Sequence, residues 1–440
     1  MPATAKMWRM RRILSTSICA SFLLFAPVTS NSQWTQWRGT ERNGSIPGDA
    51  LKGEWLPNAV MLWQQVVGNG LSGPIVSGDR IWVHSRKAGR EVVSSLALNS
   101  GKIIWSRSYN APFKQDPTAA IAGLGPFSTP ALAGGRLFTF SVNAVLSCWD
   151  AQSGTLLWRK EYSSDFDPSY PIFGMSISPL VWEDRCFVHF GSSGREALDE
   201  KGAIIALRAS DGNEIWRWAG DGPALGASPV LAVIKNDWQL IFKTENNIVG
   251  LHPRTGKELW RIPFKVSMDN TIVTPLIIGD KLLTSDYEMG FCAWHIQSDG
   301  NSWSAQEIWK NRSLSLSTSS PVVVGDQVFG FTHFRKGQLF GIDPGDGKIV
   351  WRGEARWGEW APTPLISCGD NLLAFKEDGT LVVAKVSRDG LLSQRRYRLG
   401  NYPMWGHPAI AGNCIITRDG NRLVAWRIMK ETERTRVDLQ

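Results

Sequence analysis

The sequence lacks the short motifs that mark most enzymes and metal proteins. Its six cysteines are scattered, and no two have the C-x-x-C spacing that holds zinc or attaches haem. It contains no P-loop, no G-x-S-x-G turn around a nucleophilic serine and no H-E-x-x-H pair. The six histidines show no spacing typical of metal ligands. Hydrolase, nucleotide-binding and metal-centred functions therefore have no local support.

Long apolar runs are also missing, except near the N-terminus. There, Arg9, Arg11 and Arg12 precede an apolar stretch from Ile13 to Ala26, which is short for a membrane span. Cys19 lies inside that stretch, so we do not expect it to carry a lipid anchor. We predict that residues 1–32 are a signal peptide and that the mature chain is periplasmic or extracellular, with no transmembrane span.

Charge is low as well. The formal net charge of +8 falls to about +4 when the four basic residues of positions 1–32 are removed, and no later Lys/Arg run exceeds two residues. A body of this size with so little charge is not expected to bind nucleic acid. The 43% hydrophobic and 20% charged content is that of a folded chain.

Glycine and tryptophan, by contrast, are abundant, with 43 and 22 copies, and they recur in one repeated phrase. A small residue and a proline open the phrase, two apolar runs follow around a tight turn, and a polar turn with Gly leads to a closing Trp. The first copy runs from Ser72 to Trp105. The opening prolines stand 43 to 56 residues apart at Pro74, Pro130, Pro179, Pro229, Pro275, Pro321, Pro364 and Pro408.

Each copy predicts four short strands, which is one blade of a β-propeller. The closing residues, which we expect to fill the space between blades, are Trp63, Trp105, Trp158, Trp216, Trp260, Trp309 and Trp351; the seventh copy ends in Arg396-Tyr397 instead. The eighth copy has only three strands, and a spare strand lies at Val60 to Val66. We therefore predict an all-β, eight-bladed propeller over residues 60–429, closed by strand 60–66 in the last blade.

The fourth-strand phrases, such as Arg254-Thr255-Gly256-Lys257-Glu258-Leu259-Trp260, resemble the tryptophan-docking motif of the pyrroloquinoline-quinone (PQQ) repeat family. The resemblance covers residues 60 to about 429 and implies the propeller fold. Members of this family include quinoprotein dehydrogenases, which bind PQQ and calcium, and the scaffold lipoprotein of the outer-membrane BAM assembly complex. The opening phrase Trp34-Thr35-Gln36-Trp37-Arg38-Gly39 is similar to the start of a broad bacterial group of PQQ-like repeat proteins.

A dehydrogenase of this family would make demands that the chain does not meet. The vicinal Cys-Cys pair, the C-x-x-C-H haem motif and the Asp/Glu-rich loop expected for calcium are all missing. We therefore predict a non-catalytic scaffold without a cofactor, which binds an envelope protein or a small molecule. We also predict that it is a monomer. The alternative is a PQQ-dependent alcohol or sugar dehydrogenase with PQQ and calcium, and a third possibility is carbohydrate binding by loop aromatics.

Ligand contact is expected on the end of the propeller that carries the longest loops. There the repeat register gathers aromatic and polar side chains, which serve either as a binding groove or only to anchor loops. The candidates are Phe127, Phe173, Glu245, Asp286, Arg335, Trp360, Lys376, Trp405 and Arg418. Residues 33–59, with two Trp within four positions, are expected to pack across the propeller near the channel mouth, and residues 430–440 to form a tail.

Overall fold

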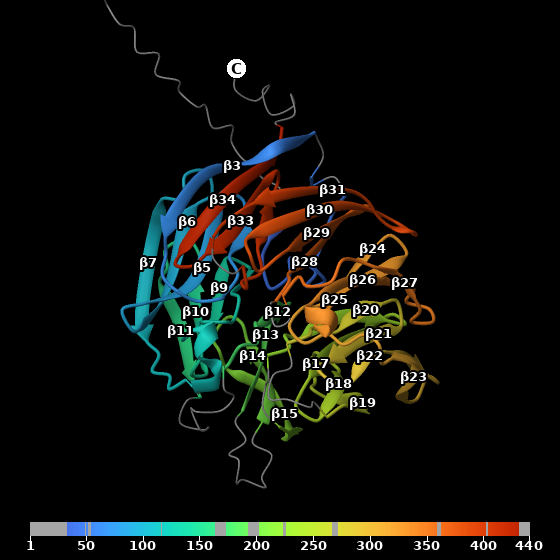
Figure 1. Ribbon diagram of the computed structural model, residues 1–440. Helices are drawn as coiled ribbons and strands as arrows, with labels where there is room; N and C mark the ends of the chain where they lie inside the picture. Colours follow the sequence, from blue (N-terminus) through green and yellow to red (C-terminus); the bar gives the residue numbers. More distant parts are fainter. Residues whose placement is uncertain are drawn as a thin grey trace, which may run out of the picture.

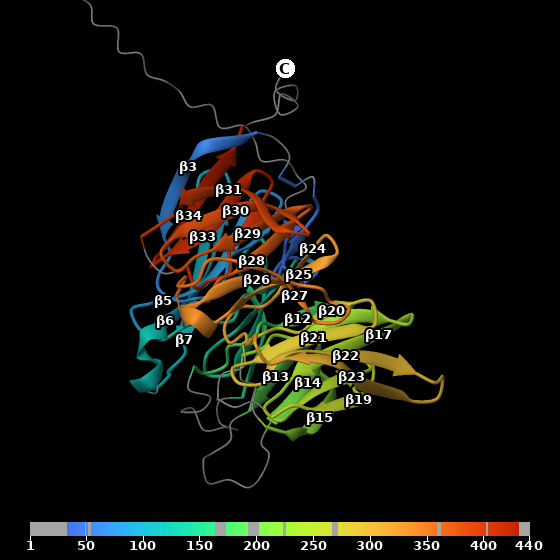
Figure 2. The same ribbon diagram turned by 45° about the vertical axis from the view of Figure 1, so that its right-hand side comes forward.

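Eight antiparallel sheets surround one axis in the computed structural model (Figures 1 and 2). It describes residues 33–48, 50–51, 54–115, 117–162, 173–191, 202–222, 226–265, 272–358, 362–401 and 404–430. Those residues form two short 3-10 helices, η1 (Pro117–Ala122) and η2 (Phe334–Lys336), neither long and apolar enough to cross a membrane. The prediction of an eight-bladed propeller is confirmed.

Each blade contains four strands, numbered here from the axis outward. In Figure 1 the first strands β12 and β28 lie near the middle, and the fourth strands β7, β15 and β23 lie at the periphery. Blades one to four are β4 (Ile75–Ser77), β5 (Arg80–Lys87), β6 (Arg90–Ala97), β7 (Ile103–Asn110); β8 (Ala131–Ala133), β9 (Arg136–Phe140), β10 (Val145–Asp150), β11 (Leu156–Glu161); β12 (Leu180–Trp182), β13 (Arg185–Gly191), β14 (Gly202–Arg208), β15 (Glu214–Asp221); and β16 (Val230–Ile234), β17 (Asp237–Lys243), β18 (Asn247–Leu251), β19 (Glu258–Pro263).

The second half of the ring repeats this order. Blades five to eight are β20 (Leu276–Ile278), β21 (Lys281–Asp286), β22 (Gly290–Ser298), β23 (Trp303–Asn311); β24 (Val322–Val324), β25 (Gln327–Thr332), β26 (Gln338–Ile342), β27 (Ile349–Arg352); β28 (Leu365–Cys368), β29 (Asn371–Phe375), β30 (Thr380–Ser387), β31 (Gly390–Arg398); and β32 (Ala409–Ala411), β33 (Cys414–Asp419), β34 (Arg422–Met429) with β3 (Trp55–Val66). Two further short strands, β1 (Gln33–Trp34) and β2 (Ser45–Ile46), join blades one and seven.

The ring closes through β3, the fourth strand of the last blade. It pairs antiparallel with β34, from Val60 opposite Arg427 to Val66 opposite Arg422. The pairing starts earlier than the predicted strand 60–66, at Trp55 opposite Met429, with two register shifts on the way. A strand from the start of the chain thus completes a sheet from its end, which leaves the ring without an open blade edge.

Tryptophan rings join neighbouring blades by one recurring contact. The Trp105 Nε1–H donates to the carbonyl oxygen of Ala151 at 3.2 Å, and the ring lies on Gly154. Gly154 has a φ of 71°, and a Cβ there would lie 2.6 Å from the ring atoms. The same indole-to-carbonyl bond joins Trp63 to Leu98 at 2.8 Å, Trp158 to Ala209 at 3.0 Å, Trp216 to Pro253 at 3.1 Å and Trp309 to Pro344 at 3.2 Å.

Three junctions depart from this pattern. Trp260 donates to the side-chain oxygen of Gln239 in its own blade, at 2.6 Å. In blade seven, Tyr397 takes the place of the missing Trp, and its hydroxyl donates to the carbonyl oxygen of Leu56 in β3 at 2.9 Å. Trp351 packs on Gly390, where a Cβ would lie 2.2 Å from the ring. The bulky residue is kept at each junction, but its hydrogen-bond partner changes.

The small residue before each opening proline links blades at the axis. Its backbone N–H donates to the hydroxyl oxygen of the equivalent residue in the next blade, which explains why Ser or Thr recurs there. Along this belt, Gly73 donates to Thr129 at 3.1 Å, Thr129 to Ser178 at 2.9 Å, Ser178 to Ser228 at 2.9 Å and Thr274 to Ser320 at 3.0 Å. Thr363 donates in the opposite direction, to Ser319 at 2.7 Å.

Residues 33–48 fill the axis, and we call them the plug. The antiparallel strands give the propeller two ends: a turn face with the turns after first and third strands, and a loop face with the remaining connections. The plug enters at the turn face, where Gln33 pairs with Ser77 at the end of β4. It leaves by the same face along β28, with Ile46 opposite Cys368. We expected the segment from residue 33 onward to pack across the propeller near the channel mouth. The structure instead places residues 33–48 inside the ring, between the first strands.

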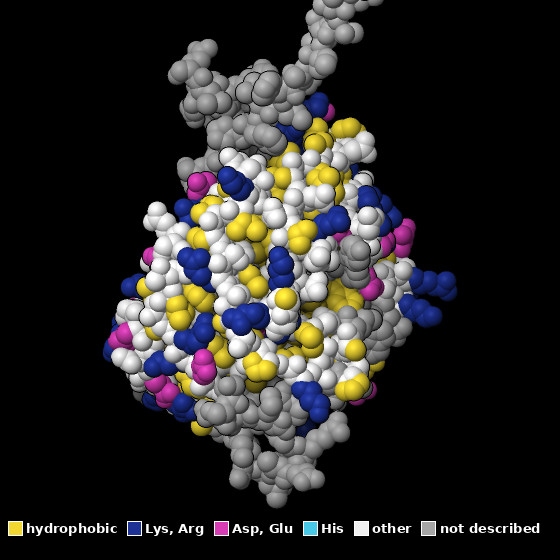
Figure 3. Space-filling model, turned by 90° about the vertical axis from the view of Figure 1, so that its left-hand side faces the viewer, with side chains coloured by type: hydrophobic (Ala, Val, Ile, Leu, Met, Phe, Trp, Pro, Cys, Tyr) yellow, Lys and Arg dark blue, Asp and Glu magenta, His cyan; other side chains and the backbone are white. Residues whose placement is uncertain are grey.

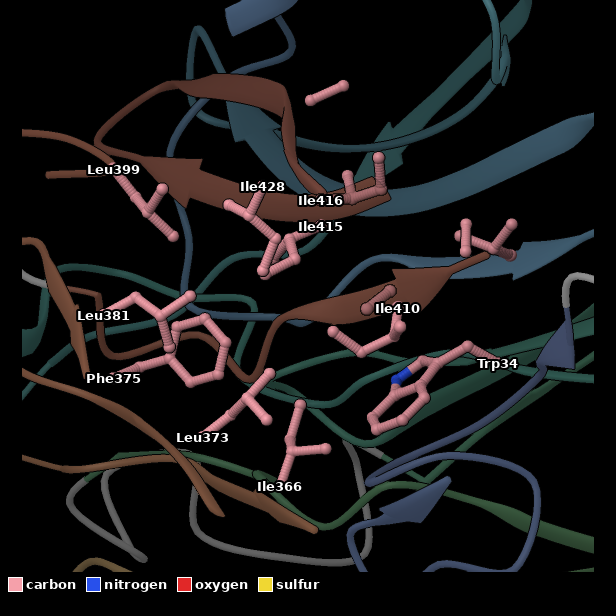
Figure 4. Close-up of a cluster of buried hydrophobic side chains, with 14 of the residues drawn as sticks. Trp34, Ile366, Leu373, Phe375, Leu381, Leu399, Ile410, Ile415, Ile416 and Ile428 are labelled. Carbon is pink, nitrogen blue, oxygen red and sulfur yellow. The ribbon is translucent and has the colours of Figure 1, made fainter. Parts of the chain in front are cut away.

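The plug contacts every blade. Besides its strand pairs with β4 and β28, it accepts a hydrogen bond from Leu132 N at Thr35 O (2.8 Å) and donates from Trp37 Nε1 to Thr274 (3.1 Å). Its arginines reach blades three, four and six. Trp34 stacks on His407 of blade eight with ring centroids 5.6 Å apart, and Figure 4 shows its ring beside Ile410 in a buried apolar cluster. The axis of the ring is therefore largely occupied by the chain itself.

The tryptophan contact can be tested at its glycine. Gly154→Ala should lower the free energy of unfolding by about 3 kcal/mol, because the methyl group meets the Trp105 ring and the left-handed backbone disfavours a Cβ. Gly78→Ala is the control: its φ is 59°, but a Cβ there would meet nothing within 4 Å. It should cost only about 1 kcal/mol. Urea denaturation measures both, and equal losses would contradict the docking role.

Two buried histidines predict sensitivity to mild acid. Burial lowers the pKa of His407 to about 3 and that of His189 to about 4. When the pH falls from 7 to 5, both histidines become protonated in the unfolded chain but stay neutral in the folded chain. The free energy of unfolding therefore falls by about 2 kcal/mol for each histidine over that pH change. Urea denaturation at both pH values measures this loss. His407→Gln should remove about half of it; an unchanged slope would show that His407 does not titrate in this way.

Candidate binding surface on the loop face

The predicted site residues that the structure describes lie on the loop face, and they differ in how deeply they are buried. Asp286, at the end of β21, is buried and forms an ion pair with Lys243 at 3.2 Å across the junction of blades four and five. The Lys243 ammonium also donates to Ser285 O at 2.5 Å. Burial lowers the pKa of Lys243, and the Asp286 carboxylate opposes that change. This pair joins two blades beneath the surface.

Arg418 has a similar buried position between blades eight and one. Its Nη1 donates to the carbonyl oxygens of Gly68 (3.3 Å) and Gly70 (2.6 Å), and its Nη2 donates to His84 O at 3.0 Å. Burial lowers its pKa to about 10, so it stays charged at neutral pH. Trp405 is half-buried nearby in sequence, and no described residue accepts a hydrogen bond from its Nε1. The contacts of Arg418 hold the β3–β4 connection against the last blade.

Glu245 is half-buried in the connection after β17, next to a polar hub around Asp221. The Asp221 carboxylate accepts hydrogen bonds from Gly222 N (2.7 Å), Asn246 Nδ2 (2.8 Å), Asn247 Nδ2 (2.6 Å) and the Thr244 hydroxyl. Burial alone would raise the pKa of Asp221, but these donors together hold it below its ordinary value. The hub shapes the loop that carries Glu245, and sequence reasoning missed it because its donors follow no motif.

Two predicted aromatic residues meet on the loop face. Phe127, in the connection between blades one and two, makes an edge-to-face contact with Phe173, before blade three, at 6.1 Å between ring centroids. Both are half-buried. Trp360 lies outside the described residues.

Two further candidates, exposed Arg335 and half-buried Lys376, lie on loops of blades six and seven. Arg335 is exposed on η2, between β25 and β26, beside exposed Phe334. Lys376 follows β29, with its ammonium 5.1 Å from the centroid of the Trp357 ring and 3.4 Å from the Asp378 carboxylate. Phe331 contacts the same Trp357 ring at 6.4 Å. We call Phe334, Arg335, Lys336, Trp357 and Lys376 the blade-six cluster.

Backbone hydrogen bonds fasten the η2 loop to the β27–β28 connection, which carries Trp357. Gly358 N donates to Lys336 O at 3.0 Å and Trp357 N donates to Gly337 O at 3.1 Å. Arg335 and Lys336 both have left-handed backbone, with φ of 57° and 61°, which is unfavourable for residues with a Cβ. The backbone of the η2 loop is thus strained at two residues of the cluster.

The sequence analysis named Arg335 and Lys376 as candidates for ligand contact. It did not name Phe334, because only its place in a loop set that residue apart.

The cluster is basic and aromatic. Arg335, Lys336 and Arg356 are exposed, and the one ion pair shown for the cluster itself is that of Lys376 with Asp378. Burial and the positive charge of Arg335 together lower the pKa of Arg352. Beside it, Tyr287 and His333 stack at 4.4 Å, which extends the aromatic surface toward blade five. Arginine and aromatic side chains are the residue types enriched at the centre of protein interfaces.

The rim of the ring has a different character. Its fourth strands expose Ile103, Ile104, Leu156 and Leu157 in blades one and two. Figure 3 shows that hydrophobic side chains on this side lie in separate patches among Lys and Arg. Scattered apolar residues of this kind are normal on protein surfaces. The blade-six cluster is therefore the stronger candidate surface.

Calcium does not fit the buried carboxylates described above. Asp286 is paired with the Lys243 ammonium, and Asp221 already accepts four hydrogen bonds, so neither carboxylate is available to a cation without breaking its contacts. Within the described ranges, no three His, Cys, Asp or Glu side chains are grouped as metal ligands. The first strands around the axis are also lined by the plug.

The fold and the docked tryptophans define an eight-bladed propeller of PQQ-like repeats. A family profile described as outer membrane protein assembly factor BamB matches residues 89–353, more than half of the chain, and the chain belongs to that family. The outer membrane protein assembly factor BamB of Yersinia pestis is 23% identical over 289 residues, which cover 61% of this chain and 69% of that protein. The suspected family is thereby confirmed.

Enzymes share the repeat as well. A polyvinylalcohol dehydrogenase of Sphingopyxis sp. (strain 113P3) is 25% identical over 210 residues, which cover 45% of this chain but only 30% of that protein. Among solved structures, BamB from Moraxella catarrhalis has a TM-score of 0.60 at 15% identity, covering 85% of this chain and 99% of that one. Quinohemoprotein alcohol dehydrogenase from Comamonas testosteroni has 0.62 at 13%, covering 92% and 82%. These structures establish the fold alone.

A double-mutant cycle tests the structural role of Asp286. Lys243→Met should cost about 3–5 kcal/mol of unfolding free energy, because it leaves a buried carboxylate unpaired. Adding Asp286→Leu should recover much of that loss, since the unpaired charge disappears with it. Urea denaturation of the two single variants and the double variant gives the coupling. Additive losses would show that the two side chains do not depend on each other.

Proposed function

We propose that this protein is an exported, non-catalytic scaffold that binds a protein partner in the cell envelope through the loop face. The observation that carries the proposal is the blade-six cluster, a basic and aromatic surface in which backbone bonds join the η2 loop to the connection of Trp357, and Lys376 packs on the Trp357 ring. The buried ionisable groups of the same face are engaged in contacts between blades. Membership of the BamB family supports a role in binding proteins.

The chemistry of the cluster points to an acidic partner segment with an apolar side chain. Arg335 and Lys336 offer charge at the edge, while Phe334 and Trp357 offer ring surface for burial. In this proposal the protein works without a cofactor, and residues 1–32 direct it to the periplasm or the outside of the cell. Assembly of outer-membrane proteins, the process in the name of its relatives, is the natural setting for such a partner.

A charge reversal tests the surface directly. Arg335→Glu combined with Lys336→Glu should reduce recovery of the native partner from cross-linked envelope fractions at least tenfold, because a buried like-charge contact costs several kcal/mol. Lys348→Glu is the matched control, since it is highly exposed on the opposite face of the same blade. Equal recovery with both variants would contradict binding at this surface, and unchanged thermal unfolding would show that folding is intact.

A quinoprotein dehydrogenase is the second candidate, because the matched part of polyvinylalcohol dehydrogenase is as similar as that of the BamB relatives. The purified protein would be mixed with PQQ and calcium and then assayed for dye reduction with alcohols and sugars. The scaffold proposal predicts neither bound PQQ absorption nor turnover. Turnover that depends on PQQ would replace it with the enzyme.

A further inference from the structure

The plug carries two arginines into the middle of the ring, and both are buried. Arg42 uses nearly all its donors: Nε to Pro229 O (2.8 Å), Nη1 to Pro179 O (2.9 Å) and Gln36 Oε1 (3.1 Å), and Nη2 to Ser178 O (3.1 Å). Arg38 donates from Nη2 to Asn43 O (3.0 Å) and Pro321 O (2.5 Å). All of these partners are neutral oxygens.

Two positive charges are thus enclosed without an opposite charge. In the described part of the chain, no Asp or Glu forms an ion pair with either guanidinium. Burial lowers the pKa of both arginines to about 9, and the charge of Arg38 adds to this effect at Arg42. Both stay protonated at neutral pH. Carbonyl dipoles stabilise such charges only in part, and enclosed unpaired charge costs several kcal/mol.

One nitrogen of Arg38 finds no partner in the part of the chain that the structure describes. Its Nη1 is fully buried, and both of its N–H groups need acceptors that no described residue supplies. The hydroxyls of Ser317 and Thr363, in the connections that lead to blades six and seven, are also buried without a hydrogen-bond partner among the described residues. Burial, and then the positive charge of Arg38, lower the pKa of His407 in blade eight.

We propose that a small monovalent anion, such as chloride, binds against Arg38 Nη1, the unused nitrogen of the buried Arg38 and Arg42 pair. The anion would accept from the unused N–H groups and offset the charge of the arginine pair. A large oxoanion is disfavoured, because Arg42 has little donor capacity left and Arg38 is fully buried. Water would satisfy the N–H groups, but it would leave the two charges uncompensated.

Thermal unfolding in different sodium salts tests this proposal. At pH 8 and constant ionic strength, replacing gluconate by chloride should raise the Tm by about 1–3 °C for each tenfold rise in chloride above its Kd. Bromide should act in the same way. Arg38→Gln should abolish the dependence on anion type, whereas Arg395→Gln, which changes an exposed arginine on β31, should keep it.

Crystals grown in bromide give an independent readout on the unaltered protein. An anomalous difference peak should lie within hydrogen-bond distance of Arg38 Nη1. If Arg38→Gln does not fold, Arg38→Lys serves instead and should retain a weaker chloride dependence. A Tm that is indifferent to chloride, together with a water at Nη1 and no bromide peak, would overturn the proposal. Neither result bears on the loop face, so this test is independent of the proposed function.

Discussion

The open inner edges of the first strands set the main physical constraint on this ring. A propeller arranges eight short strands around an axis, and each leaves backbone N–H and C=O groups facing inward without a strand partner. Here the chain supplies that partner itself. The plug pairs with β4 and β28, and its arginines donate to the carbonyls of Pro179, Pro229 and Pro321. Axis filling and ring closure therefore come from one continuous segment, since β3 follows the plug.

Two sets of contacts then hold the blades at different radii. The Ser and Thr hydroxyls before the opening prolines link blades beside the axis, whereas the tryptophan rings link them farther out. Neither set is uniform around the ring. Trp260 bonds within its own blade, and there the buried Lys243–Asp286 pair joins blades four and five instead. Loss of the repeated contact at one junction thus coincides with a polar contact that the repeat does not encode.

The sequence was sufficient for the architecture because the repeat is local. Proline, glycine and tryptophan each mark a place in the blade, and a missing strand at one end matched a spare strand at the other. The site was harder to predict. Asp286 and Arg418 were candidates for ligand contact but are buried between blades. Arg38 and Arg42 were not among the candidates, although Arg38 stands in the opening phrase of residues 34–39. Their partners are backbone carbonyls from distant blades, whose positions exist only once the ring has closed.

The direction of the plug also bears on where binding can occur. Because it enters and leaves by the turn face, its tip with Arg38 and Arg42 points toward the loop face and forms part of the packed interior below it. A small ligand at the axis would have to coexist with that tip, whereas a partner held by Phe334 and Arg335 would not. Because the plug fills the axis, the ring has little room for a central cavity. The same plug packs beneath the loops of blades six and seven, through its contacts with Pro321 and β28. A surface of this kind suits contact with another protein better than chemistry on a small molecule.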